Sequence, residues 1–72
     1  MRALENAIIR LLRTRPFYGQ LLLQVRKTPL STPRHAAGVT FKDGVPTIMV
    51  HTERFEALLP VEQEVLLLHL IT

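Results

Sequence analysis

The chain has no cysteine among its 72 residues. This absence excludes disulfide bonds and thiolate metal sites together. It leaves the redox compartment open, although small secreted domains more often contain cysteines. A single domain of this length buries a limited part of its surface, and such domains usually gain stability from disulfides, a metal or a partner chain. Two supports therefore remain: self-association, and a metal held by histidine and carboxylate side chains.

Long apolar runs are also absent. The longest is Val65–Leu68, which resumes at Leu70 and Ile71 after His69 and is far too short to span a bilayer. Charged residues interrupt the N-terminal segment, so it has no continuous signal-peptide core. We therefore expect a cytoplasmic protein that makes no membrane contact.

The usual motifs of an enzyme site are missing too. Gly19, Gly38 and Gly44 are isolated, which leaves no glycine-rich phosphate loop. No Ser/His/Asp or Cys/His arrangement for nucleophilic catalysis can be assembled from the sequence. No catalytic residue is therefore assigned.

Charge is distributed unevenly along the chain. Residues 1–42 contain eight Lys/Arg against one Glu, and residues 43–72 contain one Arg against five Asp/Glu, so the halves carry +7 and −4 and sum to the net charge of +3. A basic half can bind nucleic acid. It can equally attract the acidic half, within the chain or across a dimer. We favour this second interpretation because the basic residues are scattered rather than clustered.

Two helices are expected at the N-terminal end. Leu4, Ile8, Leu11 and Leu12 recur at helical spacing, and this pattern stops before Pro16. A second helix is expected from about Phe17 to Arg26, with Pro16 in its first turn and with Arg26 and Lys27 at its end, where they complement the helix dipole. The segment from Lys27 to Arg34, which contains two prolines, is expected to be an irregular connection.

A β-hairpin is expected next, with strands at Ala36–Phe41 and Thr47–His51 around an Asp43-Gly44 turn. Val39, Phe41, Ile48 and Val50 are expected to share one face of it. Pro46 suggests that the amide position there faces an edge.

Two more helices follow. Thr52 is expected to cap a short helix from Glu53 to Leu58, and Pro60 opens the last helix. From Val65 to Ile71 that helix is apolar nearly all round, which is typical of a buried helix and is difficult to satisfy in so small a domain.

The sequence thus predicts a single α+β domain over residues 1–72, in the order helix, helix, β-hairpin, short helix, helix. The hairpin is expected to pack against the first and last helices. The expected core comprises Leu4, Ile8, Leu11, Leu12, Leu22, Val39, Ile48, Val50, Phe55, Leu58, Leu66 and Leu67.

Several stretches, taken in order, resemble the zincin-like metallopeptidase domain that lies N-terminal to von Willebrand A-like domains in bacteria. They cover nearly the whole chain: Arg15–Gly19 followed by Leu21–Leu23, Ala37–Thr40, Ile48–Val50, and Leu59–Glu64 leading into Leu66–His69. The resemblance implies a reduced zincin-like half-domain.

The resemblance also implies where chemistry would be expected. Zincins continue their helix as His-Glu-x-x-His, in which two histidines at i and i+4 hold zinc and the Glu activates its water. Here only His69 matches; Leu70 occupies the Glu position, and the second His would fall beyond Thr72. The sequence therefore looks like the front part of such a domain, cut or diverged at the active site, without peptidase activity of its own.

Three functions remain open. The first is a non-catalytic domain that forms a homodimer through its C-terminal helix, with Leu68, Leu70 and Ile71 as interface candidates and no cofactor.

The second function is a zinc-dependent peptidase or zinc-binding relic, completed by missing sequence or a partner chain, with His69 as the metal ligand. His35 and His51 are too scattered to add a specific metal pattern, although the histidines could converge in space.

The third function, ranked last, is a nucleic-acid-binding module. It would use Arg2 together with Arg10, Arg13, Arg15, Arg26 and Lys27. It ranks last because aromatic residues do not interleave with these basic residues, as stacking on bases would require.

Overall fold

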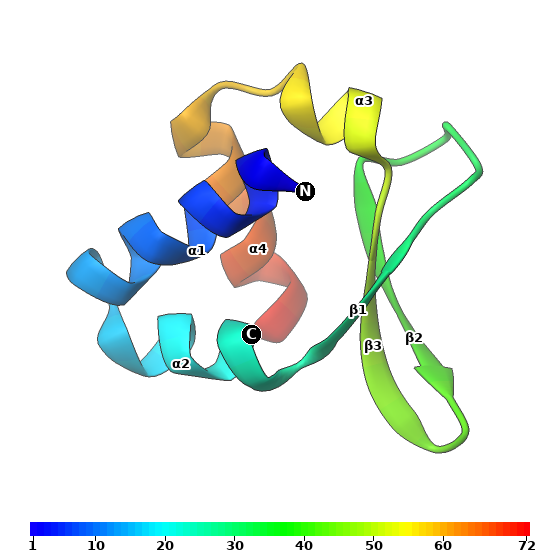
Figure 1. The fold of residues 1–72 in the computed structure, drawn as a ribbon, viewed down its shortest axis with the longest axis horizontal. Helices are drawn as coiled ribbons and strands as arrows, with labels where there is room; N and C mark the ends of the chain where they lie inside the picture. The colour runs from blue at the N-terminus through cyan, green and yellow to red at the C-terminus, as the bar shows by residue number, and fades with distance from the viewer.

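The computed structural model describes residues 1–72 as a layer of helices packed on one face of a three-stranded sheet (Figure 1). The elements, in chain order, are α1 (Arg2–Thr14), α2 (Pro16–Gln24), β1 (Arg26–Pro29), β2 (Ala37–Lys42), β3 (Val45–Val50), α3 (Thr52–Glu56) and α4 (Pro60–Ile71). Helices α1, α2 and α4 gather on one side of the sheet, and α3 lies at one end of it. None of the helices has the length and hydropathy that a membrane span requires. The predicted α+β class is confirmed.

The N-terminal helices follow the expected apolar spacing. Helix α1 buries Leu4, Ala7, Ile8 and Leu11, which lie along one face, and it ends just before Pro16, the first residue of α2. Helix α2 then packs closely against α1. A Cβ atom at Gly19 would lie only 2.7 Å from the backbone N and Cα of Leu12, so the close approach of the two helices requires glycine there.

The sheet contains the expected hairpin and one further strand. Strand β3 lies in the centre, paired antiparallel with β2 and parallel with β1. The turn places Asp43 at φ 53° and Gly44 at φ 75°, so both central residues have the positive φ that favours Asp-Gly in two-residue hairpins. Pro46 lies in the central strand, but β1 begins opposite Thr47, so no strand needs an amide hydrogen from Pro46 on that side.

Strand β1 corrects the sequence prediction. The segment beginning at Lys27 was expected to be irregular, and the second helix was expected to continue to Arg26, whereas α2 ends at Gln24 and β1 covers Arg26–Pro29. The strand is short and polar, and its register with β3 is what defines it. The Lys27 amine nevertheless lies at the C-terminal end of α2, where it was expected to complement the helix dipole. Its Nζ donates hydrogen bonds to the carbonyl oxygens of Leu23 at 3.2 Å and Val25 at 2.9 Å.

The cap of α3 also differs from the prediction. Thr52 is the first residue of the helix, and the preceding residue, His51, is the cap. The backbone N–H of Arg54 donates a hydrogen bond to His51 Nδ1 at 3.2 Å. His51 therefore has a local structural role at the junction of β3 and α3.

The buried core joins residues from both layers. It comprises Leu4, Ala7, Ile8, Leu11, Leu22, Ala37, Ile48, Val50, Phe55 and Leu67. Leu12, Leu58 and Leu66 were also predicted to be core residues, but they are only partly buried and pack against the core from outside. Val39 was wrongly assigned to the core: it is 45% exposed, although Ile48 opposite it in the central strand is buried, because β2 is the edge strand of the sheet.

An apolar groove beside the last helix as the candidate functional site

Helix α4 has one side against the domain and one side open. Its inner side buries Leu67 and Gln63, and its outer side leaves Val61 63% exposed and Val65 60% exposed. The four-residue spacing of these two valines places them one turn apart on the same face. The apolar helix is therefore only half covered by a domain of this size.

The outer side of α4 forms one wall of a shallow groove. The groove has a volume of about 510 Å³ and runs between α4, the segment after α3 and the residue before β2. Its lining is mostly apolar and consists of Ala36, Leu58, Val61, Glu62, Val65, Leu66 and His69. A mostly apolar surface depression on a small domain is the kind of feature that marks an interaction site.

The predicted interface residues lie beside this groove rather than in it. Leu68, Leu70 and Ile71 are partly buried and pack against the core. The more exposed apolar residues of the helix, Val61 and Val65, were missed by the sequence reasoning. Their signal was present in the sequence, because Val65 begins the apolar run and Val61 lies one turn before it, but the predicted interface was placed at the end of that run.

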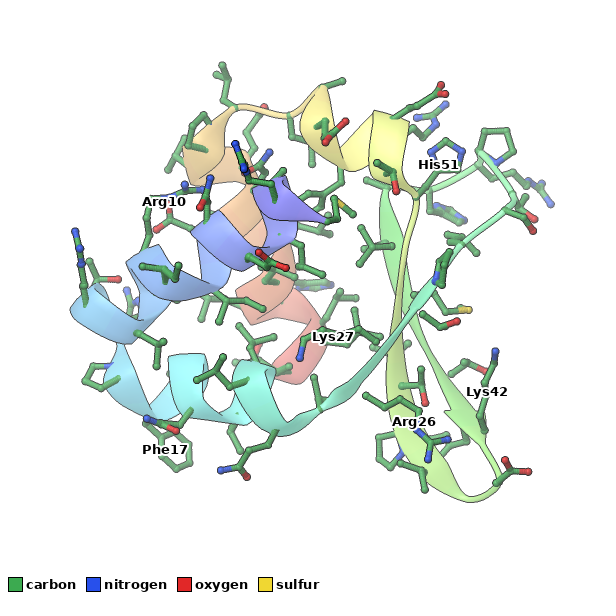
Figure 2. The ribbon with its side chains drawn as sticks, in the orientation of Figure 1. Arg10, Phe17, Arg26, Lys27, Lys42 and His51 are labelled. Atoms are coloured by element: carbon green, nitrogen blue, oxygen red, sulfur yellow. The ribbon has the colours of Figure 1, made fainter.

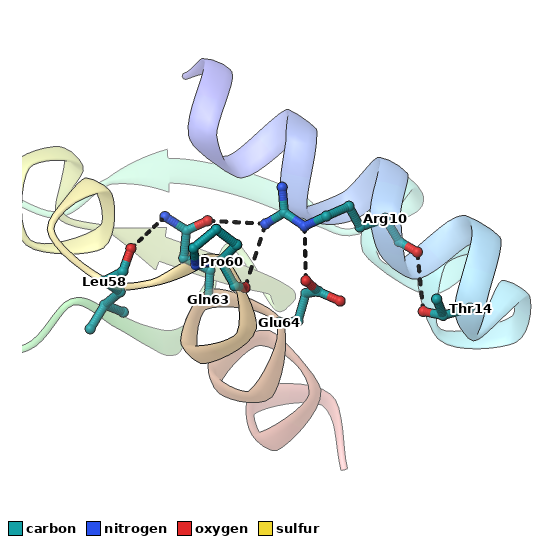
Figure 3. Close-up of polar contacts among 6 residues, drawn as sticks. All are labelled: Arg10, Thr14, Leu58, Pro60, Gln63 and Glu64. Carbon is teal, nitrogen blue, oxygen red and sulfur yellow. Dashed lines mark hydrogen bonds and ion pairs between the residues drawn. The ribbon is translucent and has the colours of Figure 1, made fainter.

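A polar cluster fixes the other side of α4 to the rest of the domain (Figure 3). Arg10 of α1 donates from Nε to Glu64 Oε2 at 2.8 Å and from Nη2 to Gln63 Oε1 at 3.2 Å. Gln63 in turn donates from Nε2 to the carbonyl oxygens of Phe55 at 3.0 Å and Leu58 at 3.3 Å. All polar atoms of the buried Gln63 side chain therefore have partners.

This cluster bears on the uneven charge of the chain. Arg10 belongs to the basic half and Glu64 to the acidic half, and they form an ion pair with side chains that are 35% and 22% exposed. In this pair, the two halves attract one another within one chain, which is the interpretation that the scattered charges favoured.

The other proposed nucleic-acid residues have different environments. The Lys27 amine already donates hydrogen bonds to two backbone carbonyl oxygens, and desolvation by burial lowers its pKa. Arg13, Arg15 and Arg26 are exposed. Figure 2 shows Lys27 directed toward the end of α2, whereas Arg26 lies on the far part of the sheet near the hairpin. The structure thus scatters the basic residues over different elements.

The histidines do not come together. His51 caps α3, His35 is exposed in the connection before β2, and His69 is exposed at the groove. No group of three or more His, Asp or Glu side chains is placed to hold a metal ion. Glu62 is the only other potential ligand that lines the groove with His69. These residues do not make up the three protein ligands typical of catalytic zinc.

Comparison with known proteins gives no relative from which function could be transferred. No family model matches the chain, and neither a curated protein nor a solved structure matches it.

Proposed function

We propose that this protein is a non-catalytic domain that forms a homodimer through the outer side of α4 and the adjoining groove. The observation that carries this proposal is the half-covered helix: Val61 and Val65 are both at least 60% exposed beside an apolar depression. Covering such side chains with a second apolar surface removes them from water and favours association. A two-fold dimer is the commonest closed arrangement for a single kind of chain.

The solvent-accessible surface of the chain is larger than expected for a folded monomer of its mass, which agrees with a helix that is only half covered. A folded monomer of 8.2 kDa is expected to expose about 4,500 Å², whereas this chain exposes 4901 Å². Only 13 of its 72 residues are buried. A second copy that covered part of this surface would supply the stabilisation that a chain without disulfides does not obtain from cross-links.

Sedimentation velocity and light scattering at protein concentrations from about 1 µM to about 100 µM test the proposal, because this range covers association free energies of about 5.5 to 8 kcal/mol. The unchanged chain is expected to form dimers. A double variant, Val61→Ser with Val65→Ser, is expected to dissociate about 100-fold more readily, because four apolar side chains are lost per dimer. Ile9→Ser is the control, because Ile9 is an exposed apolar residue of α1 that does not line the groove.

Two results would overturn the proposal. One is a chain that stays monomeric over the whole concentration range. The other is a dimer that the double variant leaves as strong as before. Circular dichroism of each variant establishes that a change in mass reflects association rather than loss of the fold.

A further inference from the structure

The outer edge of β2 is open to pairing. The strand order is β1, β3, β2, so β2 has a neighbour on one side only. Pro46 lies opposite Phe41 and has no amide hydrogen, so these two residues cannot form a hydrogen-bonded pair. At the other end of the ladder, the N–H of His51 donates to the carbonyl oxygen of Ala36 at 2.8 Å.

These two facts fix the direction of every backbone group in β2. Hydrogen-bonded and non-hydrogen-bonded pairs alternate along an antiparallel ladder. Every second residue from Ala36 onward therefore forms its backbone hydrogen bonds with β3. The residues between them, Ala37, Val39 and Phe41, direct their N–H and C=O groups away from the sheet. The open edge thus presents the N–H and C=O groups of these three alternate residues to a further strand.

The two edges of the sheet differ in how well they are protected. The β1 edge is four residues long, ends in Pro29 and contains Arg26 and Lys27, all of which discourage pairing with another strand. The β2 edge is six residues long and has a charge only at its last residue, Lys42. The edge of β2 is therefore the one suited to accept another strand.

The side chains at this edge are also apolar and uncovered. Val39 is 45% exposed and Phe41 is 71% exposed. Both lie on the same face as Ala37, and that face carries the helices, because Val39 is paired with the buried Ile48. Ala36, the residue just before the strand, lines the groove of α4. The open edge and the groove are therefore neighbouring parts of one apolar region.

The spacing of the open backbone groups selects one register for a second copy. A two-fold antiparallel pair uses all three outward residues only when Val39 lies opposite Val39 of the second copy. This register places Phe41 opposite Ala37 of the second copy, next to the residue that begins the groove. Because opposite side chains lie on the same face, the exposed phenyl ring then meets the helix-covered side of that copy.

We infer that two copies join by antiparallel pairing of their β2 strands, with Val39 at the two-fold axis and Phe41 of each copy packed at the α4 groove of the other. The inference rests on the proposed function and specifies its geometry: a continuous six-stranded sheet with the helices of both copies on one face. A stable interface takes about 800 Å² from each partner, about one-sixth of the 4901 Å² surface. The strand edge and the groove are both needed to supply it.

Cross-linking gives a direct test, because the chain has no cysteine of its own. Directly opposite residues of a hydrogen-bonded antiparallel pair have Cα atoms about 5.5 Å apart, which is within the range for a disulfide. Val39→Cys is therefore expected to form a disulfide-linked dimer under mild oxidation. Val65→Cys and Ile9→Cys, at exposed positions away from the axis, are expected to remain mostly unlinked.

Substitution of the phenyl ring gives a second test that needs no cysteine. Phe41→Glu is expected to shift sedimentation to the monomer, and Phe41→Leu is expected to retain the dimer. Both variants are expected to fold, because Phe41 is mostly exposed in the single chain.

The outcomes separate this inference from the proposed function. A dimer that cross-links through Val65→Cys but not through Val39→Cys would overturn strand pairing and leave the proposed use of α4 intact. Equal cross-linking of all three variants would overturn the register, because it would indicate random collision. A chain that is monomeric at all concentrations would overturn both proposals.

Discussion

Helices α1 and α4 have similar lengths, 13 and 12 residues, but they relate to the core in different ways. Helix α1 separates polar from apolar residues and buries four of the latter. Helix α4 is apolar nearly all round from Val65 to Ile71, yet the whole helix buries only Leu67 and Gln63. In a small domain, the neighbours that pack around a helix limit its burial more than its composition does. Helix α4 has α1 and the sheet on one side and an open groove on the other.

The largest effect on the free energy of unfolding is expected for a substitution on the inner side of α4, compared with one on its open side. Leu67→Ala removes a fully buried side chain and is expected to lower the free energy of unfolding by about 2–5 kcal/mol. Val65→Ala, on the open side, is expected to lower it by less than about 0.5 kcal/mol when the chain is monomeric. Urea denaturation at low protein concentration measures both values.

Leu67→Val extends this comparison to a smaller change. It keeps the site apolar and is expected to retain the fold even if the alanine variant unfolds in buffer. Equal losses for Leu67→Val and Val65→Ala would contradict the assignment of an inner and an outer side.

A smaller loss is expected where α1 meets α2. Alanine forms helix better than glycine by about 1 kcal/mol, yet Gly19→Ala would bring a methyl group to 2.7 Å from the backbone of Leu12. The two helices would have to separate, and the net destabilisation is expected to be about 1–3 kcal/mol. Gln20→Ala, at the exposed neighbouring position, is the control and is expected to be neutral or slightly stabilising. Thermal unfolding distinguishes the two, and an increase in Tm for Gly19→Ala would show that the helices are not closely packed.

Much of the fold could be predicted because its signals are local. The apolar period of α1, the proline at the start of α2 and the Asp43-Gly44 turn each depend on residues close together in sequence. The missed strand β1 depends instead on pairing with β3, about twenty residues further along, while its own sequence contains a proline and two charges that resemble a loop. Likewise, His51 caps α3 through its ring nitrogen, a role for which Thr52 was the more usual candidate.

The candidate site could be predicted only in part, for a related reason. The sequence indicated that α4 is too apolar for a small domain to cover, and the structure leaves one side of it open. Which side faces outward depends on the placement of α1 and the sheet. The sequence pattern therefore indicated Leu68, Leu70 and Ile71 as interface candidates rather than Val61 and Val65. The exposure of Phe41 depends on how far the hairpin extends past the helices, which no local pattern encodes.

The smallest effect is expected at the ion pair that ties α4 to α1. Arg10 and Glu64 are partly exposed, so the coupling between Arg10→Met and Glu64→Gln in a double-mutant cycle is expected to be about 0.5–1 kcal/mol. Salt screens such a pair, and 1 M NaCl is expected to reduce the coupling markedly. Urea denaturation of the four chains at low and high salt provides the values. Arg10 also donates to the amide oxygen of Gln63, and this contact survives Glu64→Gln. Arg10→Met removes that contact in both backgrounds, so it cancels from the coupling. A coupling that salt does not change would therefore mean that a hydrogen bond between Arg10 and Glu64, rather than the attraction between the two charged halves of the chain, holds this pair together.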